Sequence, residues 1–249
     1  MARNFLTWGI HCVRSALEHA PHDALELWIK DSDPSRELVG IKTLSESIGL
    51  VVQMVPPKTL ARLSEDAVNQ GVVLRRRAPT PLALDAYISG LPEQSTPALL
   101  LILDQVQDPH NFGACLRVAE GAGVDAVLIT RDNCAPISGT VAKAASGALD
   151  TVEIISVANL VRSLDQLRDA GIWLIGADHG GGQTIFECAL DMPTGLILGS
   201  EAKGLRQLTR KKCDHFASIP MAGSVTSLNV STATAIMLYE ACRQRAMGG

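Results

Sequence analysis

The chain has 249 residues, of which 47% are hydrophobic, and a formal net charge of −4 at pH 7. This length and composition support one large domain or two small domains with buried cores. The small negative charge excludes a protein that holds nucleic acid through an overall basic field, so a nucleic-acid partner would have to bind local patches.

The first 77 residues alternate between helix and strand signals. Apolar residues recur with a helical period in two segments and form short strand-like runs in three others. The predicted elements are a helix at 10–20, a strand at 25–29, a helix at 36–48 and strands at 50–55 and 71–74. We therefore expect a compact α/β domain over residues 1–77, which closes on Arg75, Arg76 and Arg77.

Residues 78–97 have the composition of a linker. They hold four of the twelve prolines and only a short helical centre. Prolines at this density disfavour both helix and sheet, so we expect a connecting segment here.

Residues 98–249 alternate strongly between apolar strands and helices. The run at 99–103 is continuously apolar, as expected for a strand that is covered on both faces of a parallel sheet. The further predicted strands are at 126–129, 152–155, 173–176, 195–198 and 216–219, and the helices at 112–122, 141–147, 160–170 and 231–245. This alternation predicts a parallel sheet with helices on both faces.

Cysteine, histidine and hydropathy patterns exclude several other classes. The six cysteines and six histidines show no C-x-x-C pair and no metal-ligand spacing. We expect free thiols in a reducing compartment and no metal. The chain shows no signal-peptide core, and no apolar run reaches the ~20 residues of a membrane span. These features predict a soluble, cytoplasmic protein.

The first candidate site segment follows the predicted strand at 99–103. Asn111 and Gly113 lie where a helix begins, and Arg117 follows one turn later. Ligands of open α/β sheets bind beyond the carboxyl ends of strands, and helix N-termini attract anions. Because a guanidinium matches phosphate and carboxylate oxygens, Arg117 is a candidate anion-binding residue. An ordinary helix start with a solvated arginine is the alternative.

The second segment, LGSEAKG at residues 198–204, also leaves an apolar strand. Gly199 would permit close approach of backbone to a ligand. Glu201 is either a helix-capping residue or a functional carboxylate. The basic side chains that follow at 206 and 210–212 are those expected of a solvated helix face.

The third segment, SIPM at 218–221 with SLNVS at 227–231, carries more polar residues than a helix start requires. Ser231 or Asn229 can cap the helix that follows. One cap is sufficient, so Ser227 and the second of these two polar residues need another explanation.

These three segments, in this order and at these intervals, resemble the motifs of the SpoU/TrmH family of RNA 2′-O-ribose methyltransferases. Within that family the chain is similar to the bacterial members that methylate a guanosine of 23S rRNA. GIHCVRSALE at residues 9–18 resembles the start of their N-terminal domain. Asn69, where relatives often have His, and the glycine-rich stretch at 177–183 depart from the pattern.

The resemblance implies a fold and a reaction. Residues 98–249 would form a parallel-sheet methyltransferase domain with a deep trefoil knot, and residues 1–77 a small L30e-like RNA-binding domain. The methyl donor would be S-adenosyl-L-methionine, the substrate a guanosine ribose 2′-hydroxyl of 23S rRNA, and the active form a homodimer.

The resemblance also implies roles for individual residues. The cofactor-binding residues would be Gly199, Ile219, Met221 and Leu228. The catalytic group would be Asn111, Arg117, Glu201, Ser227 and Asn229. Arginine keeps its proton, so Arg117 would orient a phosphate and stabilise negative charge rather than act as a simple base. In the N-terminal domain, the phosphate contacts would be Arg75, Arg76 and Arg77.

Three alternatives remain open at this point. The first is the same chemistry on tRNA, and the second is a non-catalytic RNA-binding protein of ribosome assembly. The third is a nucleotide-dependent oxidoreductase. The glycines at 121 and 123 close a helix, whereas a dinucleotide fingerprint opens one, which argues against the third.

Overall fold

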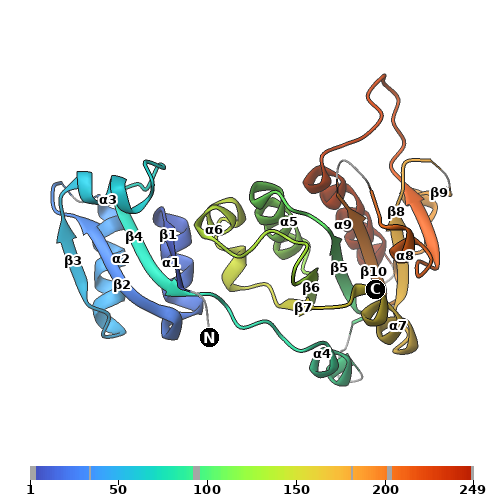
Figure 1. Cartoon of the computed structure of the whole chain (residues 1–249), viewed down its shortest axis with the longest axis horizontal. Coiled ribbons are helices and arrows are strands. Elements are labelled where there is room, and N and C mark those ends of the chain that lie inside the picture. The colour runs from blue at the N-terminus through green and yellow to red at the C-terminus, as the bar shows by residue number, and fades with distance from the viewer. Residues whose placement is uncertain (1–3, 34, 92–95, 181, 201–203, 248–249) are drawn as a thin grey trace. The chain divides into compact units, whose positions relative to one another are not determined.

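The computed structural model describes residues 4–33, 35–91, 96–180, 182–200 and 204–247, and the chain divides into two compact units (Figure 1). The N-terminal unit is Met1–Thr80 with Pro136–Thr151, and the C-terminal unit is Pro81–Ala135 with Val152–Gly249. The N-terminal unit therefore includes a segment from the middle of the chain.

A four-stranded mixed sheet forms the frame of the N-terminal unit. Its strand order is β1-β4-β2-β3, in which β2 and β3 are parallel and the other two pairs are antiparallel. The strands are β1 (Asn4–Trp8), β2 (Ala24–Lys30), β3 (Val52–Val55) and β4 (Val72–Arg77), and the helices are α1 (Ile10–His19), η1 (Pro21–Asp23), α2 (Arg36–Ser47) and α3 (Pro57–Leu63). The unit contains both helices and strands, as predicted. The strand β1 and the helix α3 were not predicted.

The core of this unit lies between the sheet and the helices α1 and α2. The two-residue period of β2 places Leu27 and Ile29 on one face, where both are fully buried. They pack in one cluster with Leu17 of α1 and with Leu38 and Ile41 of α2. Each such side chain contributes ~1.5–3 kcal/mol when it leaves water, so this cluster holds the helices against the sheet.

Residues 136–151 complete the N-terminal unit through α6 (Gly139–Ala145) and η3 (Ala148–Asp150). The hydroxyl of Ser15 donates a hydrogen bond to the Gly147 carbonyl at 3.0 Å. Gly139 lies so close to the Trp8 ring that a side chain at this position would collide with it. The segment is thus a packed part of this unit, although the strands on either side of it belong to the other sheet.

A seven-stranded parallel sheet forms the C-terminal unit, and it confirms the predicted parallel α/β architecture. The strand order is β7-β6-β5-β10-β8-β11-β9. The strands are β5 (Leu99–Asp104), β6 (Ala126–Thr130), β7 (Ile154–Val157), β8 (Trp173–Ala177), β9 (Gln183–Thr184), β10 (Thr194–Gly199) and β11 (His215–Ser218). Strands that are distant in sequence, such as β5 and β10, are therefore neighbours in the sheet.

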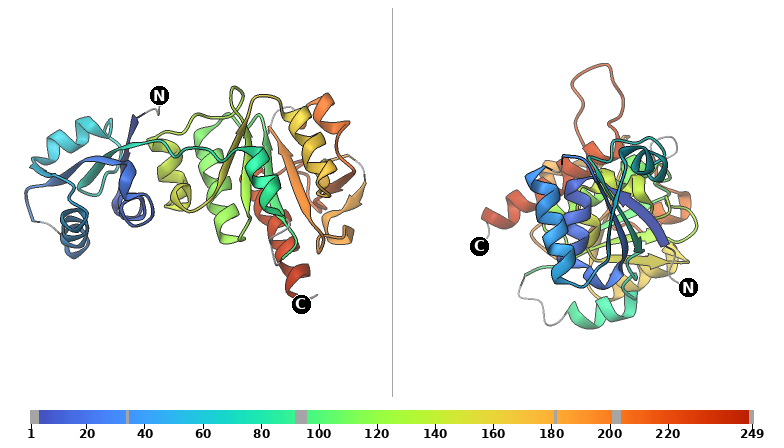
Figure 2. Two further views of the ribbon diagram at one scale, coloured as in Figure 1. Left: turned by 90° about the horizontal axis from the view of Figure 1, so that it is seen from below. Right: turned by 90° about the vertical axis from the view of Figure 1, so that its left-hand side faces the viewer.

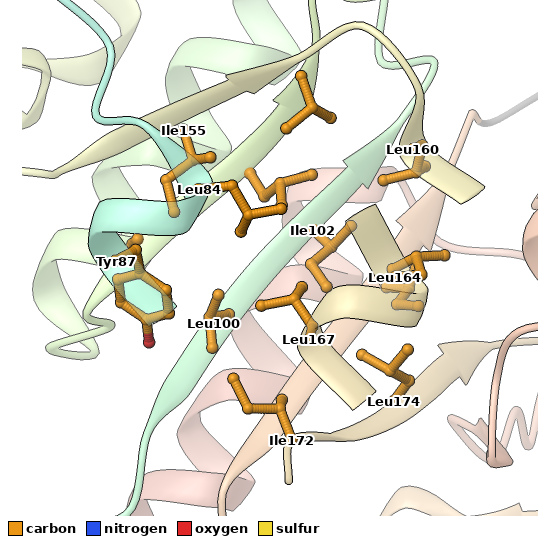
Figure 3. Close-up of a cluster of buried hydrophobic side chains, with 14 of the residues drawn as sticks. Leu84, Tyr87, Leu100, Ile102, Ile155, Leu160, Leu164, Leu167, Ile172 and Leu174 are labelled. Carbon is orange, nitrogen blue, oxygen red and sulfur yellow. The ribbon is translucent and has the colours of Figure 1, made fainter. Parts of the chain in front are cut away.

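One face of this sheet is covered by α4 (Leu84–Gly90) and α7 (Leu160–Asp169). Figure 3 shows Leu84 and Tyr87 of α4 beside Leu100 of the central strand β5, with Leu164 and Leu167 of α7 farther along the same cluster. All five side chains are buried. The helix within the predicted linker is therefore part of the hydrophobic core.

The helices α5 (Pro109–Gly121) and α9 (Val230–Met247) pack against each other, and α9 also contacts β10 (Figures 1 and 2). Phe112 and Leu116 of α5 and Met237 and Leu238 of α9 are fully buried. The remaining short helices are η4 (Ile185–Glu187) and α8 (Gln207–Arg210). Both faces of the sheet thus carry helices, as the sequence predicts.

The division into units differs from the predicted boundaries of 1–77, 78–97 and 98–249 in two places. The segment predicted as a linker contributes α4 to the C-terminal core, because its apolar residues recur with helical spacing between the prolines. Residues 136–151 pack in the N-terminal unit rather than in the C-terminal one. Both segments pack against parts of the chain that are distant in sequence, so local composition could not predict where they pack.

Candidate functional site

The carboxyl ends of four adjacent strands form the edge of the C-terminal sheet where the three motifs lie. In sheet order, β5, β10, β8 and β11 end at Asp104, Gly199, Ala177 and Ser218. Parallel strands end at a common edge, so the loops that follow them gather there. The first motif follows β5, the second follows β10 and the third follows β11.

An apolar pocket lies at this edge and unites three of the four predicted cofactor-binding residues. Ile219, Met221 and Leu228 all line it. The other lining residues come from the end of β8, from β11 and from α9, and they are Ala177, Asp178, His179, Ala217, Ala233 and Met237. A pocket with mainly aliphatic walls and few polar groups suits a flat, weakly polar ring.

Gly199, the fourth predicted cofactor-binding residue, is not among the residues that line this pocket. It ends β10, where the backbone turns back and the Gly204 amide donates a hydrogen bond to the Ser200 carbonyl at 2.8 Å. A side chain at position 199 would collide with the peptide of Gly204. The structure therefore explains this glycine by close approach of the chain to itself.

Asn229 connects the third motif to the first. Its amide nitrogen donates a hydrogen bond to the Asn111 side-chain oxygen at 2.9 Å. Its own side-chain oxygen accepts from the Ser231 amide at 2.9 Å and from the Ser231 hydroxyl at 2.6 Å. Helix α9 begins at Val230, so Asn229 is the residue that caps it and Ser231 lies within its first turn.

The other predicted catalytic residues occupy different positions around this contact. Arg117 is exposed on α5, six residues after Asn111, and within the described part of the chain it makes no hydrogen bond or ion pair. Ser227 is exposed in the loop between β11 and α9, which extends away from the sheet (Figures 1 and 2). Glu201 lies outside the described residues.

An ion pair that was not predicted joins the buried end of β5 to the segment that follows β10. Asp104, the last residue of β5, is fully buried. It accepts hydrogen bonds from the Arg206 backbone amide at 3.2 Å and from the Arg206 Nε at 2.7 Å. A buried carboxylate requires such partners, and this pair ties the second motif to the strand that precedes the first.

A second charged pair lies beside the apolar pocket, at the end of β8. Asp178, which lines the pocket, accepts a hydrogen bond from Arg210 at 2.8 Å. This hydrogen bond holds the pKa of the Asp178 carboxyl below its usual range. Asp178 follows a parallel strand directly, and that position was the signal in the sequence that could have identified it.

The basic run of the second motif is therefore not a uniform solvated face. Arg206 binds Asp104, Arg210 binds Asp178, and Lys212 forms an ion pair with Asp165 at 2.7 Å. These contacts occupy much of the positive charge that the sequence shows at residues 206–212.

The three arginines of β4 have different environments, and the prediction for Arg76 was wrong. Because side chains alternate along a strand, Arg76 points into the unit, is 1% exposed and pairs with buried Asp150. It therefore cannot contact a phosphate from solvent. Arg75 lies on the surface with Glu26 at 2.6 Å, and Arg77 donates to the His22 carbonyl at 2.8 Å.

Asn69, which departs from the family pattern, has a structural role in the turn before β4. Its side-chain oxygen accepts from the Gly71 amide at 3.0 Å, and its amide nitrogen donates to Ser64 at 3.0 Å. Gln70, the next residue, adopts a φ of 57°, so this turn depends on the hydrogen bonds of Asn69.

Metal and disulfide chemistry receive no support from the described side chains. All six cysteines are free thiols. In residues 4–247, outside the gaps given above, no three histidine, cysteine or acidic side chains are grouped so that they could hold a metal ion. Over the same residues, no helix is long and apolar enough to cross a membrane.

Two families match separate parts of the chain. The SpoU rRNA Methylase family matches residues 98–239, and a family described as RNA 2'-O ribose methyltransferase substrate binding matches residues 6–82. The chain is 42% identical to the 23S rRNA (guanosine-2'-O-)-methyltransferase RlmB of Pectobacterium atrosepticum over 240 residues, which is 96% of this chain and 98% of that protein. The Escherichia coli protein of the same name is 40% identical over the same shares of the two chains.

A solved structure extends this likeness to the fold. The SpoU methyltransferase AviRb from Streptomyces viridochromogenes, in complex with the cofactor AdoMet, superposes with a TM-score of 0.82. It is 26% identical, and the superposition covers 98% of this chain and 91% of that one. Family, relatives and fold agree over nearly the whole length, and the chain belongs to the SpoU rRNA Methylase family.

Proposed function

We propose that this protein transfers a methyl group from S-adenosyl-L-methionine to the ribose 2′-hydroxyl of a guanosine in 23S rRNA. The observation that carries the proposal is the identity of about 40% to 23S rRNA (guanosine-2'-O-)-methyltransferases over nearly the full length of both chains. A match over both units means that the substrate-binding part and the methylase part are both represented.

The side chains that line the apolar pocket are of a kind that suits the cofactor that the family implies. Ile219, Met221 and Leu228 would enclose the adenine ring, because aliphatic side chains pack against the flat faces of an aromatic ring. AviRb, which shares the fold, binds AdoMet. When bound, the cofactor supplies a methyl group on a positively charged sulfur. Gly199 would contribute by keeping the end of β10 compact beside this site.

The catalytic residues act on the ribose hydroxyl and on the RNA backbone. Because a guanidinium is a cation that only donates hydrogen bonds, Arg117 orients the neighbouring phosphate and stabilises the negative charge that grows on the hydroxyl oxygen. The Asn111–Asn229 hydrogen bond holds α5 and the start of α9 in register, which positions Arg117. Ser227 and Glu201 complete the group by orienting the hydroxyl and the cofactor loop.

The N-terminal unit selects the RNA. Support comes from the substrate-binding family that matches residues 6–82. Arg75 and Arg77 are the phosphate contacts on β4, since both lie on the surface. We assign this unit an L30e-like fold, in which helices pack on a small mixed sheet.

Three further features belong to this proposal. The C-terminal unit forms a trefoil knot, which would bring the chain segments after β10 and β11 together at one edge of the sheet. The protein acts as a homodimer, in which the half-exposed Tyr239 of α9 contributes to the interface. Its location is the cytoplasm, where bacterial ribosomal RNA is processed.

The alternatives are disfavoured by particular observations. Relatives that align over at least 96% of this chain are named for 23S rRNA, which favours that substrate over tRNA. The same relatives are named as methyltransferases, which disfavours a non-catalytic assembly protein.

The test is to map ribose methylations in 23S rRNA from cells with and without the gene, and from cells in which the gene is restored. We expect one guanosine to lose its 2′-O-methyl group on deletion and to regain it on complementation. An unchanged 23S rRNA pattern together with a lost tRNA methylation would transfer the activity to tRNA. No change in either RNA would overturn the proposal.

A further inference from the structure

Two hollows meet at the end of β8, and Asp178 belongs to both. The first is the apolar pocket described above. The second is a larger, more polar hollow beside β11, and its walls include Gly182, Arg210 and Phe216. A ligand with an apolar ring in the first hollow and polar groups at the entrance to the second would therefore pass beside Asp178.

The carboxylate of Asp178 is held in a defined orientation. One oxygen accepts a hydrogen bond from the His179 amide at 2.9 Å, and the other accepts from Arg210 at 2.8 Å. The Arg210 guanidinium in turn lies over the Phe216 ring, 4.6 Å from its centroid. A carboxylate has about four sites that can accept a hydrogen bond, so these two bonds leave others for a ligand.

The chemistry of this carboxylate favours neutral donors. Arg210 already balances its charge, so a second cation would gain less here than at an unpaired carboxylate. The adenosine part of S-adenosyl-L-methionine carries two adjacent ribose hydroxyls directly beside its flat aromatic ring. A carboxylate just after a parallel strand is a general solution for binding a ribose hydroxyl in sheets of this kind.

We propose that Asp178 accepts hydrogen bonds from the ribose hydroxyls of the cofactor and that Arg210 is the residue that positions it. The inference rests on the proposed function, because it assumes that the adenosyl group occupies the apolar pocket. It assigns a role to the stretch after β8, which departs from the family pattern. It also gives a role in cofactor binding to the ion pair that Arg210, in the basic run, forms with Asp178.

The experiment measures binding and does not depend on methyl transfer. Isothermal titration calorimetry compares S-adenosylhomocysteine with its 2′-deoxy and 3′-deoxy analogues on the wild-type protein and on Asp178→Ala. We expect the wild type to bind at least one deoxy analogue about tenfold more weakly than the parent, as for a lost hydrogen bond to a charged group. Asp178→Ala should bind the parent and that analogue equally.

Two further variants separate positioning from folding. Arg210→Gln should lose the discrimination between parent and deoxy analogue, and Arg210→Lys, which retains a charged donor, should restore part of it. Asp165→Ala is the matched control, since Asp165 is also an ion-paired aspartate of the C-terminal unit but lines neither hollow. It should leave both affinities unchanged, and thermal unfolding of each variant should show an intact fold.

The outcomes distinguish the two proposals. If the wild type does not bind S-adenosylhomocysteine, the proposed function fails. If it binds parent and both deoxy analogues with equal affinity, the function stands and the role of Asp178 is overturned. A variant Asp178→Ala that still discriminates the analogues would also overturn it, because the hydroxyls would then be bound elsewhere.

Discussion

At the edge of the C-terminal sheet where the three motifs lie, residues that are distant in sequence are in contact. On β4, by contrast, arginines that are adjacent in sequence have different surroundings. At the motif edge, Asn111 and Asn229 are 118 residues apart and share a hydrogen bond. On β4, Arg75 and Arg76 are adjacent, yet one lies on the surface and the other is buried with Asp150. Residues that are adjacent in sequence form a common site only when they share a face of their element.

The largest expected effect is on stability, and it concerns Arg76, the buried arginine of β4. Arg76→Ala leaves Asp150 as a buried charge without its partner, which we expect to lower the free energy of unfolding by ~3–5 kcal/mol. Urea denaturation followed by tryptophan fluorescence measures it, since Trp8 and Trp28 both lie in the N-terminal unit.

The matched control is the neighbouring residue. Arg75→Ala removes a surface ion pair and should change the free energy of unfolding by less than about 1 kcal/mol. Replacing both partners of the buried pair with apolar residues, Arg76→Met with Asp150→Leu, should recover most of the loss. Equal effects of Arg75→Ala and Arg76→Ala would contradict the different environments of the two residues.

The next largest effect is on the rate of methyl transfer, and it concerns Arg117 in the first motif. Arg117→Ala should lower the rate of methyl transfer by at least ~10²–10³-fold, because it removes a donor that stabilises developing charge. Transfer of a labelled methyl group to 23S rRNA measures the rate, and the melting temperature should stay unchanged because Arg117 is exposed. Arg162→Ala, at an exposed arginine of α7, is the control and should keep the wild-type rate. A near wild-type rate for Arg117→Ala would remove Arg117 from the mechanism.

The parallel sheet of the C-terminal unit could be predicted because each of its main strands shows a local run of apolar residues. The run at β5 is apolar throughout and all six of its residues are buried, which is the pattern of a central parallel strand. Three of the four predicted cofactor residues do line one pocket, because their segments follow strands that end at a common edge.

What could not be predicted depends on contacts that are distant in sequence or on signals that have two meanings. Helix α3 was not predicted, although it begins at Pro57 and proline is favoured in the first turn of a helix. The burial of Arg76 requires Asp150, which comes from a segment 74 residues away. The alternation of β4 alone could have indicated that Arg76 points away from Arg75 and Arg77.

A smaller effect separates the two tasks of Asn229. Asn229→Ala removes both the cap of α9 and the bond to Asn111, and we expect a loss of ~1–2 kcal/mol in the free energy of unfolding. Asn229→Asp keeps the oxygen that accepts from Ser231 but cannot donate to Asn111. It should therefore recover stability while methyl transfer remains impaired. If Asn229→Asp restores both, the residue serves only as a cap.

The smallest expected effect tests whether the exposed arginines of β4 bind RNA. Arg75→Gln and Arg77→Gln should each weaken binding of a 23S rRNA fragment a few-fold and lower the slope of log K against log salt by ~0.7–0.9 per lost phosphate contact. Lys42→Gln is the control, because this exposed lysine is ion-paired like Arg75 but lies on α2 and not on β4. A slope that falls for Lys42→Gln as much as for Arg75→Gln would indicate diffuse attraction. A fall confined to Arg75 and Arg77 would show that one face of β4 binds the RNA while the opposite face, through Arg76, holds the unit together.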